Sequence, residues 1–359
     1  MLVAKWGARR TLACFLALSG FGCVLFATSS SLSAIMLGRV LCGMGVAVLL
    51  TSAMALFVRW FPAEAYGRLC GWFFCFGGMG AILGTAPLAV LNDVLGWRTL
   101  FLGLGIATFA VALACLAFVR NQPDKALSAV KVELAPLRFT EILFRLKSVA
   151  RQTDFWRLSA WFFCISGIYY GFFALWGGPY LAQAHRLPQH HIGGVLSMGA
   201  MGFVFGSPVY TWIWEKIFKS YRGGLCVSGV LAFVCCGIFS LSGKGFPLPL
   251  LYVVALCLGI ACNAPNALAY ASARNLFGPA MTATLSGILG FCAFMGGASL
   301  QSLGGLLIDT ALRHGWSVPD AYKLLFAPYF IYAIVSFVLL WKLTETCPLR
   351  DEAQGRDAS

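Results

Sequence analysis

The chain consists mostly of long apolar stretches separated by short polar loops, and this alternation limits its fold more than any other feature. A helix needs roughly 20 apolar residues to cross a bilayer. Hydrophobic residues make up 60% of the chain and charged residues 11%, whereas soluble domains are about half apolar and a quarter charged. The sequence therefore predicts an all-α polytopic membrane protein. We expect ten spans, at residues 11–28, 33–57, 67–92, 99–119, 156–184, 192–214, 224–242, 248–273, 280–308 and 322–343.

The positions of the basic residues predict how the chain is oriented. Of the 26 Lys and Arg residues, 20 fall in one alternating set of loops and tails, and five fall in the other set. Loops rich in Lys and Arg stay in the cytoplasm, so we expect both termini there, in a multi-pass protein of a bacterial-type inner membrane. The net charge of +13 therefore reflects topology. Because the basic residues form no continuous face, we expect no nucleic-acid partner.

Two segments of the chain resemble each other at an offset of about 215 residues. Gly45 and Arg59 have counterparts in Gly259 and Arg274. Two related halves around a central site are a common plan among secondary transporters. We therefore expect two helical bundles joined by a cytoplasmic linker that contains an amphipathic helix. The expected divisions are 1–119 (an incomplete bundle of four spans), 120–155 (linker), 156–344 (a six-helix bundle) and 345–359 (cytoplasmic tail).

Four short motifs, in order along the chain, resemble those of one protein family. They are Lys5-Trp6-Gly7-Ala8-Arg9-Arg10, Gly38-Arg39-Val40-Leu41-Cys42-Gly43-Met44-Gly45, Gly96-Trp97-Arg98 and Trp176-Gly177-Gly178-Pro179-Tyr180. Together they resemble the major facilitator superfamily. The resemblance implies a two-bundle fold with a pseudo-two-fold repeat, in which the ten spans correspond to helices three to twelve of twelve and Met1 falls in the loop after helix two.

The first motif and one arginine inside a span carry functional expectations from this resemblance. Lys5, Gly7, Arg9 and Arg10 would form the family's gating loop, although Ala4 stands where the family usually has Asp. Arg39 lies inside a predicted span. It would either extend its side chain to the membrane interface or face the central cavity and contact an anionic group.

Polar side chains within two later spans suggest a solute-binding site, because polar groups inside a membrane are costly and are often functional. Asn263, Asn266 and Tyr270 follow one another at steps of three and four residues, which places them on one helix face. Pro265 lies between the two amides and is expected to interrupt the helix. An alternative is that the amides only join neighbouring helices.

The span at 156–184 offers a second, aromatic group of candidates. Tyr169, Tyr170 and Trp176 lie in this span, which the resemblance also assigns to a cavity helix. Aromatic faces together with amides could bind a polar organic solute by stacking and hydrogen bonding. Packing between helices is the alternative for the two tyrosines.

Titratable groups are scarce inside the predicted spans. None of the 13 acidic residues lies in the middle of a span, so proton coupling would need a group outside this chain, or the protein would be a facilitator. The four histidines, His185, His190, His191 and His314, fall in predicted external loops. We expect them to be solvated, with a pH sensor as the alternative.

These observations predict a secondary active or facilitative transporter that moves a small polar organic solute by alternating access. An amino acid, a peptide, a sugar and an organic acid all remain open. The alternative is a truncated, non-transporting membrane protein, either an inert remnant or a subunit that regulates a partner. Because no catalytic motif is present, we expect no enzyme and no cofactor. The expected partners are the solute, the bilayer and optionally a coupling proton, and we expect a monomer.

Overall fold

The computed structural model describes residues 2–84, 86–121, 139–243 and 245–347, and the described residues contain helices and no strand. This agrees with the all-α prediction. Within a bilayer, a helix satisfies its own backbone hydrogen-bonding groups. Nine stretches of the described residues are long and apolar enough to cross a membrane. They are Trp6–Thr28, Leu32–Trp60, Trp97–Phe118, Thr153–Ala184, Gln189–Ile217, Tyr221–Leu241, Leu248–Phe277, Pro279–Arg313 and Val318–Leu340.

The predicted span at 67–92 is not among these nine stretches, and it is divided between two helices. Helix α4 covers Ala63–Leu83 and α5 covers Ala86–Leu95. Thr85, between them, lies outside the described residues. Pro87 sits in the first turn of α5, where its missing N–H is tolerated. The same proline would have broken a continuous helix.

The chain separates into two compact units. Unit 1 comprises Met1–Tyr66, Ala86–Ser148 and Phe277–Gly287. Within it, α1 packs against α2, α3 and α6. Its helices are α1 (Leu2–Thr28), α2 (Leu32–Val46), α3 (Leu49–Trp60), α5 and α6 (Trp97–Phe118), with η3 (Pro279–Met281) and most of α7 (Phe139–Ala150).

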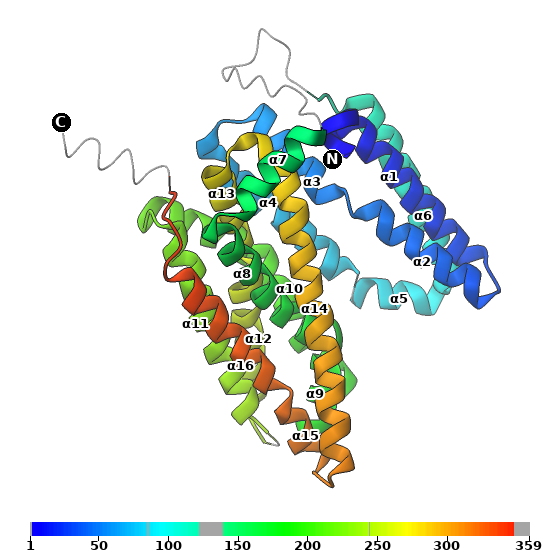
Figure 1. Ribbon diagram of the computed structural model, residues 1–359. Coiled ribbons are helices and arrows are strands. Elements are labelled where there is room, and N and C mark those ends of the chain that lie inside the picture. The colour runs from blue at the N-terminus through cyan, green and yellow to red at the C-terminus, as the bar shows by residue number, and fades with distance from the viewer. Residues whose placement is uncertain (1, 85, 122–138, 244, 348–359) are drawn as a thin grey trace. The chain divides into compact units, whose positions relative to one another are not determined.

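Unit 2 comprises Gly67–Thr85, Val149–Leu276 and Ile288–Ser359. In its interior α8 contacts α12 and α16, and α11 contacts α12 and α16 as well (Figure 1). Besides most of α4 and α14, its elements are α8 (Thr153–Gly171), η1 (Phe172–Trp176), α9 (Gly177–Ala184), α10 (Gln189–Trp212), η2 (Ile213–Ile217), α11 (Tyr221–Leu241), α12 (Leu248–Asn263), α13 (Asn266–Phe277), α15 (Val318–Leu324) and α16 (Phe326–Leu340). Helix α14 covers Thr282–Arg313.

Helix α4 belongs to the first half of the sequence but groups with unit 2. Two of its glycines explain this placement, because a Cβ on Gly71 would lie 3.4 Å from Pro208 Cα and one on Gly78 would lie 2.8 Å from Val204 Cγ2. Small residues allow helices to approach closely in a membrane. The two units each draw on both halves of the sequence. The expected division into bundles stays a prediction, and α7 lies within the expected linker.

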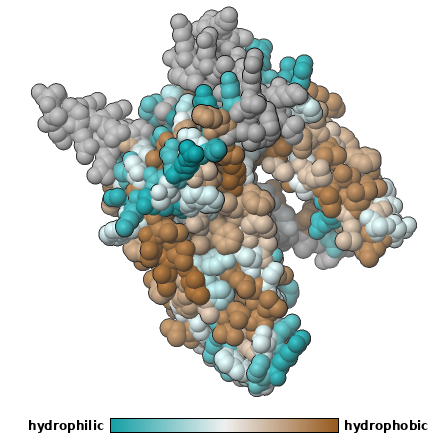
Figure 2. Space-filling model, viewed as in Figure 1, coloured by the Kyte–Doolittle hydropathy of each residue, from teal (hydrophilic) through white to brown (hydrophobic). Residues whose placement is uncertain are grey.

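The outer surface of unit 2 is apolar in its middle. In the visible face, hydrophobic side chains occupy the central part of the helices and hydrophilic ones gather toward the ends (Figure 2). Phe291 and Val338 are each more than half exposed, Ile334 is 49% exposed, and α16 consists mainly of apolar residues. A helix that is apolar on all sides is typical of a membrane environment.

Candidate solute-binding site in unit 2

The predicted interruption beside Pro265 is present. Helix α12 ends at Asn263, and α13 begins at Asn266, with Ala264 and Pro265 in a turn between them. Pro265 has no N–H, so the carbonyl of Ala261 loses the donor that a continuous helix would supply. The amide of Ala269 restores regular bonding by donating to the Pro265 carbonyl at 3.0 Å. The break thus places one asparagine on each side of a short non-helical turn.

The two asparagines are buried and only partly satisfied. Asn263 is 5% exposed and Asn266 is 8% exposed. Within the part of the chain that the structure describes, Asn263 Nδ2 and Asn266 Oδ1 have no hydrogen-bond partner. A buried polar atom without a partner costs about 1–3 kcal/mol, so such an atom needs an explanation. One atom is a donor and the other an acceptor, and both functions are present in a single hydroxyl group.

The aromatic candidates surround this break within unit 2. Tyr169 lies near the Asn263 side chain, and its ring lies 5.5 Å from that of Tyr170. Tyr270 is 4% exposed and stacks on Phe74 at 5.7 Å. Another of its ring contacts is with Phe162, at 4.8 Å. The structure therefore brings Tyr169 to the amides and embeds the Tyr270 ring among aromatic neighbours.

Trp176 takes part in a polar connection between η1 and α14. Its indole Nε1 donates to the Gln301 carbonyl at 3.0 Å, and Gln301 Nε2 donates to the Tyr170 carbonyl at 3.0 Å. The π-helical turn η1 explains why the Tyr170 carbonyl accepts this side chain, since a π-bulge shifts the local hydrogen-bonding pattern. Gln301 was not among the predicted site residues, although an amide inside an apolar span is itself a functional signal.

Arg39 lies in unit 1, on α2. Its guanidinium carbon is 5.1 Å from the ring centre of Phe26 and 5.9 Å from that of Phe101. Cation–π contacts of this kind orient a guanidinium without neutralising it. The side chain is exposed within the described residues, so its charge remains accessible. The proposed contact of Arg39 with an anionic group stays a prediction.

The predicted gating-loop residues meet the end of α6 in unit 1. Gly7 has φ +77° and ψ 162° and bends the start of α1. The Arg9 amide donates to Asn121 Oδ1 at 2.9 Å, and its guanidinium donates to the Leu116 carbonyl from both Nε, at 2.9 Å, and Nη2. A cation at a helix C-terminus is stabilising. Arg10 is exposed, and the side chain of Lys5 lies outside the described positions.

Two titratable side chains, Glu215 and His185, are buried although neither lies in the middle of a span. Glu215, in η2, is 4% exposed, accepts from the Tyr221 hydroxyl at 2.7 Å and interacts with the charges of Arg68 and Lys216. His185 is 7% exposed, so the expectation of a solvated histidine is wrong at this position. It is right at His190 and His314, which are exposed.

The chain is similar to known proteins in sequence and in structure. Residues 1–300 match the family described as the Major Facilitator Superfamily. A curated relative, the "Probable L-galactonate transporter" of Escherichia coli (strain K12), is 22% identical over 290 residues, which are 76% of this chain and 62% of that protein. The chain therefore spans less than two thirds of the length of this relative.

Solved structures share the fold. The transporter FucP in its outward conformation superposes with a TM-score of 0.68 at 18% identity, with 93% of this chain and 84% of that chain covered. The human organic anion transporter MFSD10 (TETRAN) superposes with a TM-score of 0.70 at 14% identity, with 95% and 78% covered. At these identities the likeness concerns the fold alone, and it agrees with the predicted all-helical transporter architecture.

Proposed function

The chain belongs to the Major Facilitator Superfamily, and from this premise we propose that it moves a small, hydroxyl-rich organic solute across the membrane by alternating access. Members of this family are transporters and not enzymes, and the chain is a multi-pass integral membrane protein. The proposal concerns the class of solute and the residues that recognise it. Uptake could be facilitated or coupled to a proton.

The unmatched amide atoms beside Pro265 carry this proposal. Asn263 Nδ2 is a free donor and Asn266 Oδ1 a free acceptor among the described residues. A solute hydroxyl can accept from the first and donate to the second. A carboxylate offers only acceptors and an ammonium only donors, so neither satisfies both atoms. A site built to hydrogen-bond a hydroxyl discriminates strongly against solutes that lack it.

The solutes of two similar proteins are consistent with this class. One relative is a probable L-galactonate transporter, and another is the E. coli fucose:proton symporter FucP. Both solutes carry several hydroxyl groups. An acidic sugar would also need a cationic partner.

The experiment is uptake by the purified full chain in proteoliposomes, with radiolabelled L-galactonate, L-fucose and a neutral amino acid offered separately. We expect uptake of a hydroxylated solute and a loss of uptake in Asn263→Ala and Asn266→Ala. Asn275→Ala is the matched control, because Asn275 lies on the same helix, α13, as Asn266 and its amide already donates to the Thr346 carbonyl at 2.9 Å.

Solute binding measured on the same preparations separates the two functional classes. Saturable binding without uptake would favour the alternative of a non-transporting membrane protein that retains the site. Uptake of the amino acid but of neither sugar derivative would contradict the proposed solute class. Unchanged uptake in both asparagine variants would leave the amides with a packing role only.

A further inference from the structure

Two cysteine side chains meet between α1 and α2 in unit 1, whereas the amide site belongs to unit 2. Cys23 Sγ lies 3.4 Å from Cys42 Sγ. Both cysteines are free thiols and partly buried, and each lies within one of the apolar stretches, Trp6–Thr28 and Leu32–Trp60. Because they are 19 positions apart in the sequence, it is the packing of the two helices that brings their sulfur atoms into contact.

The backbones of α1 and α2 approach each other closely beside this contact. A Cβ on Gly22 would lie 2.6 Å from the Cys42 amide nitrogen, and one on Gly38 would lie 2.8 Å from the Phe26 amide nitrogen. Small residues permit this approach between membrane helices. A disulfide requires two Cα atoms within about 7 Å of each other. Helices whose backbones touch meet this requirement without a large movement.

A hydrogen bond holds the Cys42 thiol against α1. Cys42 Sγ donates to the Ser19 carbonyl at 3.6 Å. Ser19 and Cys23 are four positions apart, so they lie on the same face of α1. The Cys42 sulfur therefore stays within reach of Cys23. To shorten the 3.4 Å separation to the roughly 2 Å of a disulfide, the sulfur atoms need to move together by little more than about 1 Å.

The side chains beside the pair determine which reagents reach it. Phe21 and Met44, each two positions from one of the cysteines, are more than half exposed, so the neighbouring surface is apolar. A charged reagent is costly to bring into such surroundings, whereas a neutral, lipid-soluble reagent is not. Two adjacent thiols react with a disulfide reagent in two successive exchanges, because the second thiol attacks the mixed disulfide that the first has formed.

We propose that Cys23 and Cys42 form a dithiol site, which a neutral, lipid-soluble organic disulfide oxidises to a disulfide bond between α1 and α2. One cysteine, as its thiolate, attacks the reagent, forms a mixed disulfide and releases one reagent thiol. The other cysteine attacks the protein sulfur of this mixed disulfide, forms the Cys23–Cys42 bond and releases the second reagent thiol. The two cysteine protons end on the released thiols, and the two electrons lost by the pair reduce the S–S bond of the reagent.

The new bond joins α1 to the turn of α2 that carries Arg39. Arg39 precedes Cys42 by three positions, and Phe26, whose ring contacts the Arg39 guanidinium, follows Cys23 by three. Residues three positions apart are neighbours on a helix surface. The disulfide therefore restrains the helix pair directly beside this contact. The inference goes beyond the proposed function, because it holds whichever solute is carried.

The test uses the full chain, reduced and held in lipid nanodiscs, with dipyridyl disulfide as the neutral reagent. Mass spectrometry of an unreduced digest identifies which cysteines have become linked. We expect a Cys23–Cys42 link, lighter than the separate peptides by the mass of two hydrogens, and dithiothreitol should restore both thiols. Separate pyridyl adducts on Cys23 and Cys42 without a link, or no reaction at either cysteine, would overturn the proposal.

Matched variants separate the pair from its individual thiols. Cys42→Ser keeps a donor for the Ser19 carbonyl, and it should abolish the link while a pyridyl adduct remains on Cys23. Cys14→Ser, at an exposed position of α1, should keep the link at the wild-type level. A link that forms between two copies of the chain, or a loss of the link in Cys14→Ser, would contradict the assignment.

A charged reagent tests the route by which the oxidant arrives. Dithiobis(nitrobenzoate) is also an aromatic disulfide, but it carries two carboxylates and does not enter the hydrocarbon phase. It should form the Cys23–Cys42 link about tenfold more slowly, or slower still, than dipyridyl disulfide at the same concentration. Equal rates for the two reagents would contradict access from the lipid phase.

Discussion

Two helix interruptions, one in each unit, differ in how their polar groups are satisfied. At Gly7 in unit 1, the Arg9 amide bonds to Asn121 and its guanidinium to the Leu116 carbonyl. At Pro265 in unit 2, Asn263 Nδ2 and Asn266 Oδ1 remain unmatched among the described residues. Backbone irregularity alone therefore does not identify a site. An unmatched buried donor or acceptor is the better indicator, because native structures seldom leave one without a reason.

The largest effect is expected at Asn263. Asn263→Ala should lower uptake of the hydroxylated solute by about tenfold or more, since a site built for a hydroxyl loses its donor. Its melting temperature in detergent should stay the same or rise, because the lost Nδ2 had no protein partner. A parallel loss of stability and uptake would instead indicate a packing role. Proteoliposome uptake and a thermal melt on one preparation decide between these outcomes.

Gly7→Ala should lower stability, in contrast to Asn263→Ala. The backbone at Gly7 lies in a region that residues with a side chain rarely adopt, and the added Cβ would lie 2.5 Å from Asn121 Nδ2. Such strain costs about 1–3 kcal/mol, so the melting temperature should fall. Gly103→Ala is the control, because a Cβ at Gly103 meets no described atom within 4 Å. An equal fall in the melting temperature of both variants would contradict a strained backbone conformation at Gly7.

Arg9→Ala should lower stability less than Gly7→Ala. It removes the hydrogen bonds to the Leu116 carbonyl and the favourable charge at the end of α6, which together contribute about 1 kcal/mol. Arg10→Ala, at the exposed neighbouring position, should have little effect. The measurement is the melting temperature at low and at high salt. The difference in melting temperature between wild type and Arg9→Ala should decrease as the salt concentration rises. A salt-independent difference would contradict a charge effect.

The smallest effect is a pH dependence of stability from His185. Because its folded-state pKa lies below the ordinary value, the unfolded chain binds more protons as the pH falls below about 6.5. Stability is therefore fully present above this pH and decreases on acidification toward the lowered pKa. The melting temperature of wild type should fall by about a few degrees relative to His185→Gln. A difference in melting temperature between wild type and His185→Gln that does not change with pH would contradict the lowered pKa of His185.

The sequence predicted the features that depend on neighbouring residues. The spans follow from runs of apolar residues, and the break follows from Pro265, whose missing N–H acts on its own helix. Each of these inferences needs only a few consecutive residues. For this reason they agree with the described helices.

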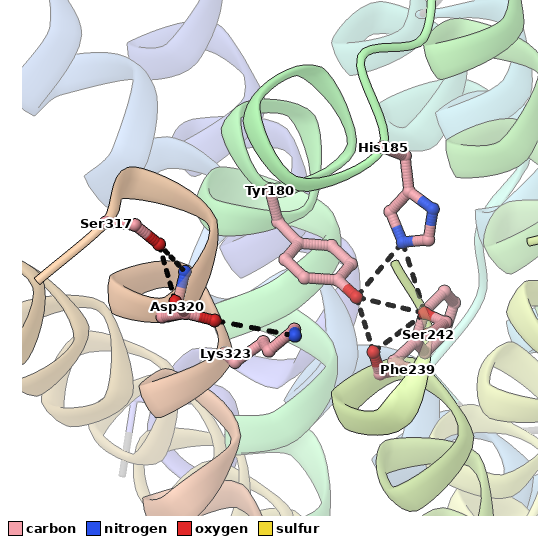
Figure 3. Close-up of polar contacts among 7 residues, drawn as sticks. All are labelled: Tyr180, His185, Phe239, Ser242, Ser317, Asp320 and Lys323. Carbon is pink, nitrogen blue, oxygen red and sulfur yellow. Dashed lines mark hydrogen bonds and ion pairs between the residues drawn. The ribbon is translucent and has the colours of Figure 1, made fainter. Parts of the chain in front are cut away.

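The features that were missed depend on residues far apart in the sequence. His185 lies in a short loop, and such loops are commonly solvated. Its side chain is buried against Ser242, 57 residues later, whose Oγ lies within hydrogen-bonding distance of the ring (Figure 3). The bond from Trp176 to the Gln301 carbonyl joins positions 125 residues apart. The grouping of α4 with unit 2 depends on Gly71 and Gly78 meeting α10. Such pairings cannot be found from local patterns.

The most direct test of the central claim is an experimental structure of the full chain with a saturating hydroxylated solute. The prediction is that one solute hydroxyl lies within hydrogen-bonding distance of both Asn263 Nδ2 and Asn266 Oδ1, beside the turn at Pro265. It would be contradicted by a solute bound elsewhere while both amides bond to neighbouring helices.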